Sequence, residues 1–247
     1  MNWITRILGV ALCVGAGLIA LPGQAGQAVQ DAQASRRVDA AAQLVRQLDL
    51  ANTDYAHGQG SISWSGVVAS HTDCSGLINH LLMHVDGYTS DDFIRWFGTR
   101  RPTADLYHDA IANGRGFVAV PSIADLLPGD VIAIKYITRR GDTGHIMMVA
   151  SPPKKMEATK PVVAGTEQWA VDVIDSSKSG HGPSDTRHKL GQFGLDHNGL
   201  GRGVFRLYTD AEGEVQGFSW STAEMSRFVA PGDEHVVLGR FVPKFRP

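Results

Sequence analysis

The apolar residues of this chain recur with a helical period in its first half and with a strand period in its second half. Four helices are predicted in the first half, at residues 31–50, 74–84, 90–98 and 103–114. Six strands are predicted after them, at residues 126–137, 144–151, 168–177, 203–210, 215–221 and 235–242. Helices followed by a run of strands predict an α+β fold, with N-terminal helices packed on an antiparallel sheet of about six strands.

The N-terminal segment has the order of a secretory signal peptide. One arginine precedes an apolar run over residues 7–21, and cleavage is expected after Ala25 or Ala28. A retained anchor is the alternative, but the run is shorter than the roughly 20 residues of a membrane span. We therefore expect residues 1–28 to be the signal and residues 29–247 to be one exported domain, periplasmic or extracellular, without stable membrane insertion.

Removal of this signal would leave a single thiol. The chain has two cysteines, and Cys13 lies within the signal, so Cys74 has no partner for an internal disulfide. An odd cysteine in an exported protein indicates a reactive thiol or an intermolecular bridge. The alternative is a buried, inert cysteine that serves as a small apolar side chain.

Composition argues against nucleic acid as a partner. The chain carries 23 basic and 25 acidic residues, a net charge of −2, and no basic stripe interleaved with aromatic residues. Apolar residues make up 43% of the chain, which is typical of a folded globular domain.

Cys74 falls in the first turn of the second predicted helix, where Thr72 or Asp73 can act as the N-cap. A helix N-terminus favours the thiolate, which is the nucleophilic form of cysteine. At about 100° per residue, Cys74 lies within roughly 20° of Leu81 on the apolar face, so its sulfur should point toward the sheet. The small side chain of Ser75 would let a substrate backbone approach.

A cysteine nucleophile needs a base, and the base needs a group that orients it. Of ten histidines, only His145 begins an apolar strand. The next strand ends in Asp175, which could hold the second nitrogen of this imidazole. Asp172 lies three residues earlier and should face the other side of the sheet. Asp175 is therefore the predicted orienting residue, although "DSSKSG" is also typical of a turn.

These motifs together resemble the NlpC-type cysteine peptidases of bacterial cell walls, a circularly permuted branch of the papain-like superfamily. The resemblance covers about residues 37–177 and lies in "DCSGL" at a helix start, then "PGDVIAI", then "GHIMMVA". "DYAHG" upstream resembles the Tyr-x-x-Gly element of that family and aligns Tyr55 with its active-site tyrosine.

The resemblance implies a papain-like domain that cleaves an amide bond in the peptide stem of peptidoglycan without a cofactor. It implies that Cys74 is the nucleophile, that His145 is the base and then the acid, and that Asp175 orients His145. The backbone N–H of Cys74 would stabilise the oxyanion, with assistance from Tyr55.

Three features depart from the family pattern. Long loops are predicted at 151–167 and 178–203, the last three strands extend beyond a minimal domain, and Gln59 stands where the family has a second glycine. Lys178 and Arg187 in the second loop could bind the carboxylates of a stem peptide. The alternative is that these cations are simply solvated.

Two other motifs suggest ligands. His80 and His84 have the i, i+4 spacing of zinc ligands, but "HLLMH" lacks the glutamate that metallopeptidases use as base, so no metal site is predicted. "GLGRG" at 199–203 precedes a strand and not a helix, so a flexible loop is expected there and not a phosphate site.

The sequence thus predicts a cysteine-type peptidase or amidase whose partners are peptidoglycan stem peptides. Two alternatives stay open. One is an inactive wall-binding or partner-binding module of the same fold. The other is an acyl transferase, or an amidase acting outside the wall. Product analysis separates hydrolysis, which frees a carboxylate and an amine, from transfer, which yields a conjugate.

Overall fold

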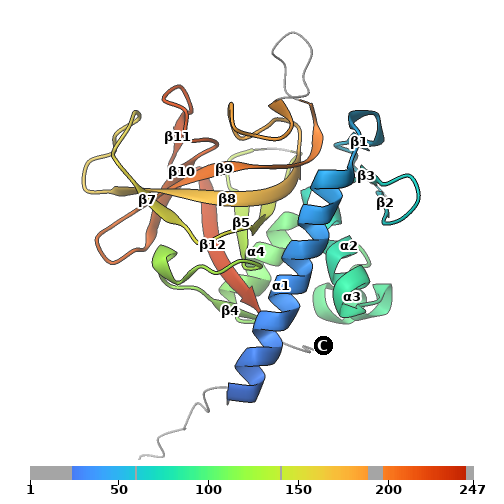
Figure 1. Ribbon diagram of the computed structural model, residues 1–247. Helices are drawn as coiled ribbons and strands as arrows, with labels where there is room; N and C mark the ends of the chain where they lie inside the picture. The colour runs from blue at the N-terminus through green and yellow to red at the C-terminus, as the bar shows by residue number, and fades with distance from the viewer. Residues whose placement is uncertain (1–23, 59, 140, 189–196, 243–247) are drawn as a thin grey trace, which may run out of the picture.

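The computed structural model describes residues 24–58, 60–139, 141–188 and 197–242 (Figure 1). The apolar core of the predicted signal peptide lies outside the described residues, and both expected cleavage positions fall within the first turns of the first helix. Among the helices that the structure describes, none is long and apolar enough to cross a membrane.

The helices are α1 (Gln24–Gln47), α2 (Cys74–Asp86), α3 (Ser90–Phe97) and α4 (Ala104–Ala112), with two short 3-10 helices, η1 (Leu50–Asn52) and η2 (Ile123–Asp125). The strands are β1 (Thr53–Asp54), β2 (Ser61–Ser63), β3 (Ala69–His71), β4 (Phe117–Ala119), β5 (Val131–Tyr136), β6 (Gly144–Val149), β7 (Lys154–Met156), β8 (Glu167–Ser177), β9 (Gly199–Thr209), β10 (Val215–Ser219), β11 (Phe228–Val229) and β12 (Glu234–Phe241).

The predicted α+β organisation is confirmed, but the main sheet is larger than expected. Nine strands form it, in the order β11-β10-β9-β8-β6-β5-β12-β4, with β7 paired to β8. All of its pairings are antiparallel. The prediction of about six strands was wrong because β4, β7 and β11 are two or three residues long, too short to show an alternating pattern.

The sheet is apolar on both faces. One face packs against α1, α2, α3 and α4, which gather on one side of the molecule in Figure 1. The other face encloses a second cluster with side chains from β5, β6, β8, β9, β10 and β12. Because β10 lies against β12 although the two do not pair, the sheet curls around this second cluster.

Two segments outside the predicted helices and strands form strands. Residues 53–71 form a three-stranded sheet in the order β1-β3-β2. The segment 199–203 is not a flexible loop but the start of β9, paired with β8 from Ser177↔Gly199 onward. The long loops at 151–167 and 178–203 are present in part, since the first contains β7 and the second ends at β9. Residues 189–196 lie outside the description.

Candidate active site

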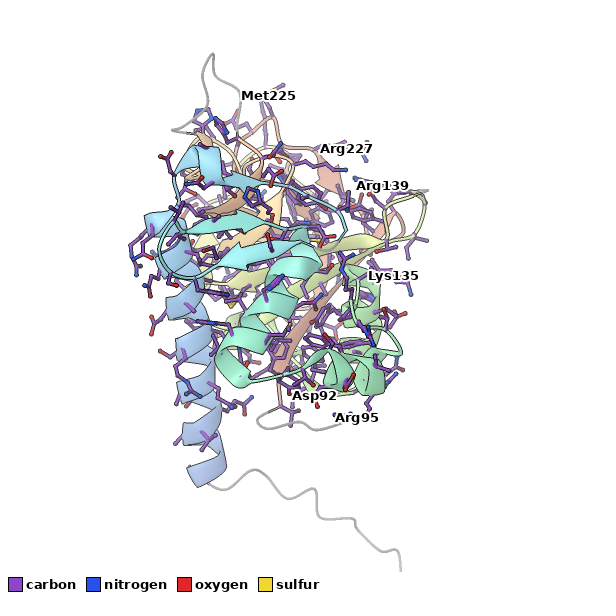
Figure 2. All side chains as sticks on the ribbon, turned by 90° about the vertical axis from the view of Figure 1, so that its right-hand side faces the viewer. Asp92, Arg95, Lys135, Arg139, Met225 and Arg227 are labelled. Atoms are coloured by element: carbon purple, nitrogen blue, oxygen red, sulfur yellow. The ribbon has the colours of Figure 1, made fainter. Side chains whose placement is uncertain are left out.

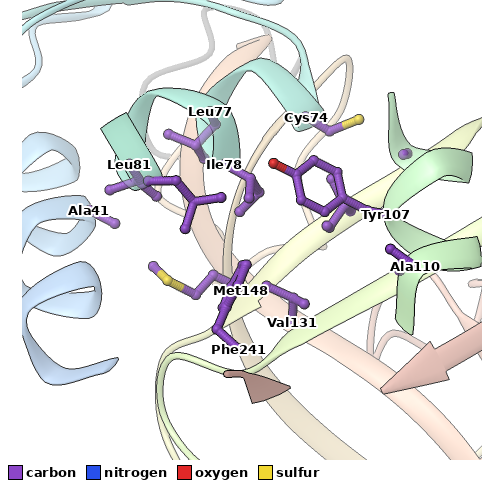
Figure 3. Packing of buried hydrophobic residues seen from close by; sticks show 14 of the residues in the cluster. Ala41, Cys74, Leu77, Ile78, Leu81, Tyr107, Ala110, Val131, Met148 and Phe241 are labelled. Carbon is purple, nitrogen blue, oxygen red and sulfur yellow. The ribbon is translucent and has the colours of Figure 1, made fainter. Parts of the chain in front are cut away.

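Helix α2 begins at Cys74 because Asp73 caps it. The Asp73 backbone is extended (φ −82°, ψ 179°), and its carboxylate accepts a hydrogen bond of 2.7 Å from the Gly76 N–H. Leu77, Ile78 and Leu81 then bury one face of the helix. Figure 3 shows Cys74 at the end of α2, with its sulfur pointing away from these side chains. The thiol is buried, as predicted, and 4% of the residue is exposed.

The Cys74 thiol has two polar neighbours. The His145 imidazole and the Tyr55 hydroxyl lie close enough to the thiol that Cys74 shifts the pKa of both groups. Burial and the negative charge on Cys74 raise the pKa of Tyr55 far above its ordinary value, so this hydroxyl stays protonated and can donate. The structure therefore brings together Cys74, His145 and Tyr55, as predicted.

His145 is held from its other side by Asp175. Its Nε2 lies 2.7 Å from Asp175 Oδ2, so Nδ1 is the ring nitrogen left for the thiol. Burial alone would lower the pKa of His145, but the charges of Cys74 and Asp175 and their hydrogen bonds outweigh burial and raise it to about 10. The imidazole is thus stabilised as an imidazolium beside the thiol.

Strand alternation decides which aspartate reaches this site. Asp175 is fully buried on the concave face of the sheet, which it shares with Val171 and Val173. Asp172 faces the other way and forms an ion pair with Arg202 near the surface. The prediction that the two aspartates lie on opposite faces, with Asp175 on the side of His145, is confirmed.

Asp175 has two further buried partners. Arg187 Nη2 donates to its Oδ1 at 2.9 Å, and His181 Nε2 lies 3.1 Å from its Oδ2. Burial would raise the pKa of Asp175, but the charges of Arg187 and His181 and the hydrogen bonds of both histidines hold it well below its usual range. Asp175 is therefore an ionised carboxylate with its oxygens fixed in place.

Arg187 does not face a substrate, and the prediction that it binds stem-peptide carboxylates was wrong. Only 1% of the residue is exposed. Its guanidinium donates to both oxygens of Asp185, at 2.9 and 2.8 Å, to Asp175, and to the Gly199 carbonyl at 3.0 Å. The Arg187 cation therefore compensates buried carboxylates. An arginine in this buried role and a solvated arginine in a loop look the same in the sequence.

A cavity of about 620 Å³ opens beside His145 and Tyr55. Its apolar wall includes Phe218, Trp220 and Val229. Lys178, Arg139 and Arg227 line it as well, and Figure 2 shows the latter two pointing outward at the same edge of the molecule. Lys178 Nζ lies 5.4 Å from the Tyr55 ring centre and 3.9 Å from Asp142.

Lys178 therefore lines the cavity. Ser75, the other residue expected near the substrate, is buried, and its hydroxyl donates to Asp73 at 3.1 Å. Ser75 therefore supports the start of α2, and it is not among the residues that line the cavity.

The two helix histidines have separate local partners. His84 stacks on Trp64 with ring centres 4.0 Å apart, and His80 lines a separate cavity together with Gly60. Within the described part of the chain, no group of three or more His, Cys, Asp or Glu side chains is arranged to hold a metal ion.

Three residues in contact with Asp175, with His145 or with their partners were not predicted from the sequence. His181 and Asp185 stand in a segment without periodicity, and Trp220 follows β10 as an ordinary apolar residue. Trp220 packs on both histidines, with its ring centre 4.4 Å from that of His181 and 5.0 Å from that of His145. No local pattern signals these contacts, because they join β6, β8, the loop after β8 and the end of β10.

Comparison with known proteins gives one clear relationship. No family model and no solved structure matches the chain. The chain is 37% identical, over 202 residues, to the "Uncharacterized protein R653" of Acanthamoeba polyphaga mimivirus, an alignment that covers 76% of this chain and 87% of the relative. The chain therefore belongs to the same protein family as this mimivirus protein.

Proposed function

We propose that this protein is a papain-like cysteine peptidase or amidase of the NlpC type, exported from the cell, which hydrolyses an amide bond in peptidoglycan stem peptides. One observation carries the proposal. A buried thiol at a capped helix N-terminus lies beside an imidazole whose pKa it raises and whose Nε2 is held by a buried, ionised aspartate. This is the nucleophile, base and orienting group that cysteine hydrolysis requires.

The chemistry would proceed in two steps. The Cys74 sulfur attacks the amide carbonyl, and the His145 imidazolium gives its Nδ1 proton to the departing amine as the C–N bond breaks. Water then attacks the thioester, His145 removes its proton, and the acid product leaves as Cys74 is regenerated. The Cys74 backbone N–H and the Tyr55 hydroxyl are the donors available to the oxyanion.

The cavity beside His145 supports a peptide substrate that carries negative charge. Its volume of about 620 Å³ can hold several residues. Lys178, Arg139 and Arg227 outnumber the carboxylates of its lining, Asp142 and Glu234, and offer cations to a substrate carboxylate. Arg227 is exposed and forms no ion pair among the described residues, so it replaces Arg187 as the candidate carboxylate ligand.

Incubation of the full chain with purified muropeptides and synthetic stem peptides, followed by mass spectrometry, tests this proposal. We expect products that gain one water across an amide bond, and none with Cys74→Ala. Conjugates in the presence of added amines would indicate transfer. Equal turnover by Cys74→Ala, or none by the wild type on any stem peptide, would contradict peptidoglycan hydrolysis by this thiol.

A further inference from the structure

We infer that His181 is a positioning residue that carries a proton on both ring nitrogens and, in that state, fixes the Asp175 oxygen that orients His145. The part of this inference that concerns catalysis rests on the proposed function. The protonation state does not, because it follows from the contacts of the imidazole itself.

Both ring nitrogens of His181 face acceptors. Nδ1 lies 2.7 Å from the backbone carbonyl oxygen of Trp220, and Nε2 lies 3.1 Å from Asp175 Oδ2. A carbonyl oxygen cannot donate, and an ionised carboxylate accepts only. A neutral imidazole has one N–H and would leave one of these buried contacts without a proton, so the doubly protonated ring is the form that satisfies both.

The charges around His181 balance only if it is a cation. The side chains of His181, Asp175, Asp185 and Arg187 are at most 1% exposed. Asp185 accepts from the His181 backbone N–H at 2.8 Å, and Arg187 bridges the two aspartates. The His145 imidazolium is balanced by the Cys74 thiolate. The remaining two carboxylates and two cations then have no net charge, whereas a neutral His181 would leave −1, which burial penalises.

The ring is also fixed in orientation by its neighbours. Trp220 packs on it at 32° between ring planes, and Phe205 of β9 meets it nearly perpendicularly with ring centres 5.9 Å apart. The titratable and charged groups facing it are Asp175 on β8, Asp185 and Arg187 on its own segment, and His145 across the shared oxygen.

This arrangement restricts Asp175 to one rotamer. Oδ1 is held by Arg187, and Oδ2 receives His181 Nε2 at 3.1 Å and His145 Nε2 at 2.7 Å. Loss of the His181 contact would free the carboxylate to turn about its last bond. The His145 imidazole, and with it the thiol contact, would then be less well oriented.

Nuclear magnetic resonance of the full chain with ¹⁵N-labelled histidine tests the protonation state directly. At pH 7 we expect two one-bond N–H cross-peaks from the His181 ring, assigned in the wild type by nuclear Overhauser contacts to the rings of Trp220 and Phe205. A single cross-peak, with the other nitrogen unprotonated, would overturn the inference. This measurement needs no activity and reads the wild-type protein, so it holds even if a variant folds poorly.

Alkylation of Cys74 tests the positioning role with two variants, one without and one with a hydrogen-bond donor. In His181→Phe the ring packing remains without donors, and we expect the rate at pH 7 to fall by about 10-fold or more. In His181→Gln an amide N–H can still reach Asp175, and we expect a rate within about 3-fold of the wild type. Equal rates for both variants and the wild type would overturn the positioning role.

The pH profile separates positioning from simple loss of structure. Both variants remove the His181 charge, which makes the buried site more negative and disfavours the Cys74 thiolate, so the acid limb of alkylation should move to higher pH in both. If the acid limb of alkylation did not move in either variant, the positive charge assigned to His181 would be overturned. A wild-type thiol that does not respond to His145→Ala would instead refute the proposed function, and the cross-peak count of His181 would remain a separate result.

Discussion

At the scale of single residues, the charge state of His145 depends on Cys74. Burial disfavours an imidazolium, and the pKa of His145 is raised to about 10 only because the thiol and Asp175 both offer it negative charge. The contribution of this ion pair to folding is fully present below the ordinary histidine pKa of about 6.5 and is lost as the pH rises through the folded value.

Replacement of Cys74 by serine should lower the pKa of His145. The serine hydroxyl stays neutral, so the favourable charge of the thiolate disappears while burial remains. Titration of the His145 ring by nuclear magnetic resonance measures this shift, with His80 as an internal reference because it lies outside the site. An unchanged His145 pKa in Cys74→Ser would mean that the thiol and the imidazole are not electrostatically coupled.

Asp175 and Asp172 form a matched pair on one strand. Asp175→Asn should destabilise the protein by about 3–5 kcal/mol, because it leaves Arg187 and His181 as buried cations without full compensation. Asp172→Asn should cost only about 0–1 kcal/mol, since its ion pair with Arg202 is partly exposed. Urea unfolding at pH 7 measures both changes.

The difference between the two variants should shrink at low pH. The pKa of Asp175 is depressed in the folded state, so its contribution is present above the unfolded value of about 3.9 and is lost as the pH falls through the folded value. Similar losses for Asp175→Asn and Asp172→Asn at pH 7 would show that the buried network is not energetically distinct from a surface pair.

At the scale of elements, β9 has to leave room for the segment that carries His181 and Arg187. A methyl group at Gly201 would lie 2.8 Å from Arg187 Cγ and Cδ and would overlap its Nε. Gly201 is paired with Asp175 across the two strands, so a bare backbone there lets the guanidinium reach the carboxylate. Glycine in "GLGRG" is thus explained by packing and not by a ligand.

Gly201→Ala should therefore displace Arg187 and cost about 1–3 kcal/mol in unfolding free energy, with slower alkylation of Cys74. Gly232→Ala is the control, because no atom lies within 4 Å of its added methyl group. Chemical denaturation and thiol kinetics of both variants check this. If Gly201→Ala behaved like Gly232→Ala, the close packing of Arg187 under β9 would be refuted.

At the scale of the whole molecule, the site exists because the sheet has two apolar faces. Helix α2 packs on one face, through Ile78 and Leu81, while Asp175 and His145 share the concave face with Val173 and Met147. The N-terminus of α2 and the start of β6 meet at one end of the sheet. The thiol reaches His145 there, beside the cavity.

The sequence was sufficient for the parts of this arrangement that local periodicity determines. Capping by Asp73, the apolar stripe of α2 and the alternation of Asp172 and Asp175 predicted the start of the helix, the burial of Cys74 and the correct aspartate. The sequence was insufficient for the short strands β4, β7 and β11, which show no alternating pattern, and for contacts between distant segments. The pairing of Arg187 and His181 with Asp175 depends on tertiary packing alone.

The measurement that tests the central claim most directly is the rate of Cys74 alkylation by iodoacetamide at pH 6, in the full chain and in His145→Ala. An ordinary thiol has a pKa of about 8.5 and is less than about 1% ionised at that pH. His80→Ala, on the same helix but outside the site, is the matched control. We expect wild type and His80→Ala to react at similar rates, and His145→Ala at least about 10-fold more slowly. A thiol that reacts equally slowly in all three proteins would contradict the thiolate–imidazolium pair, and with it the assignment of this protein as a cysteine hydrolase.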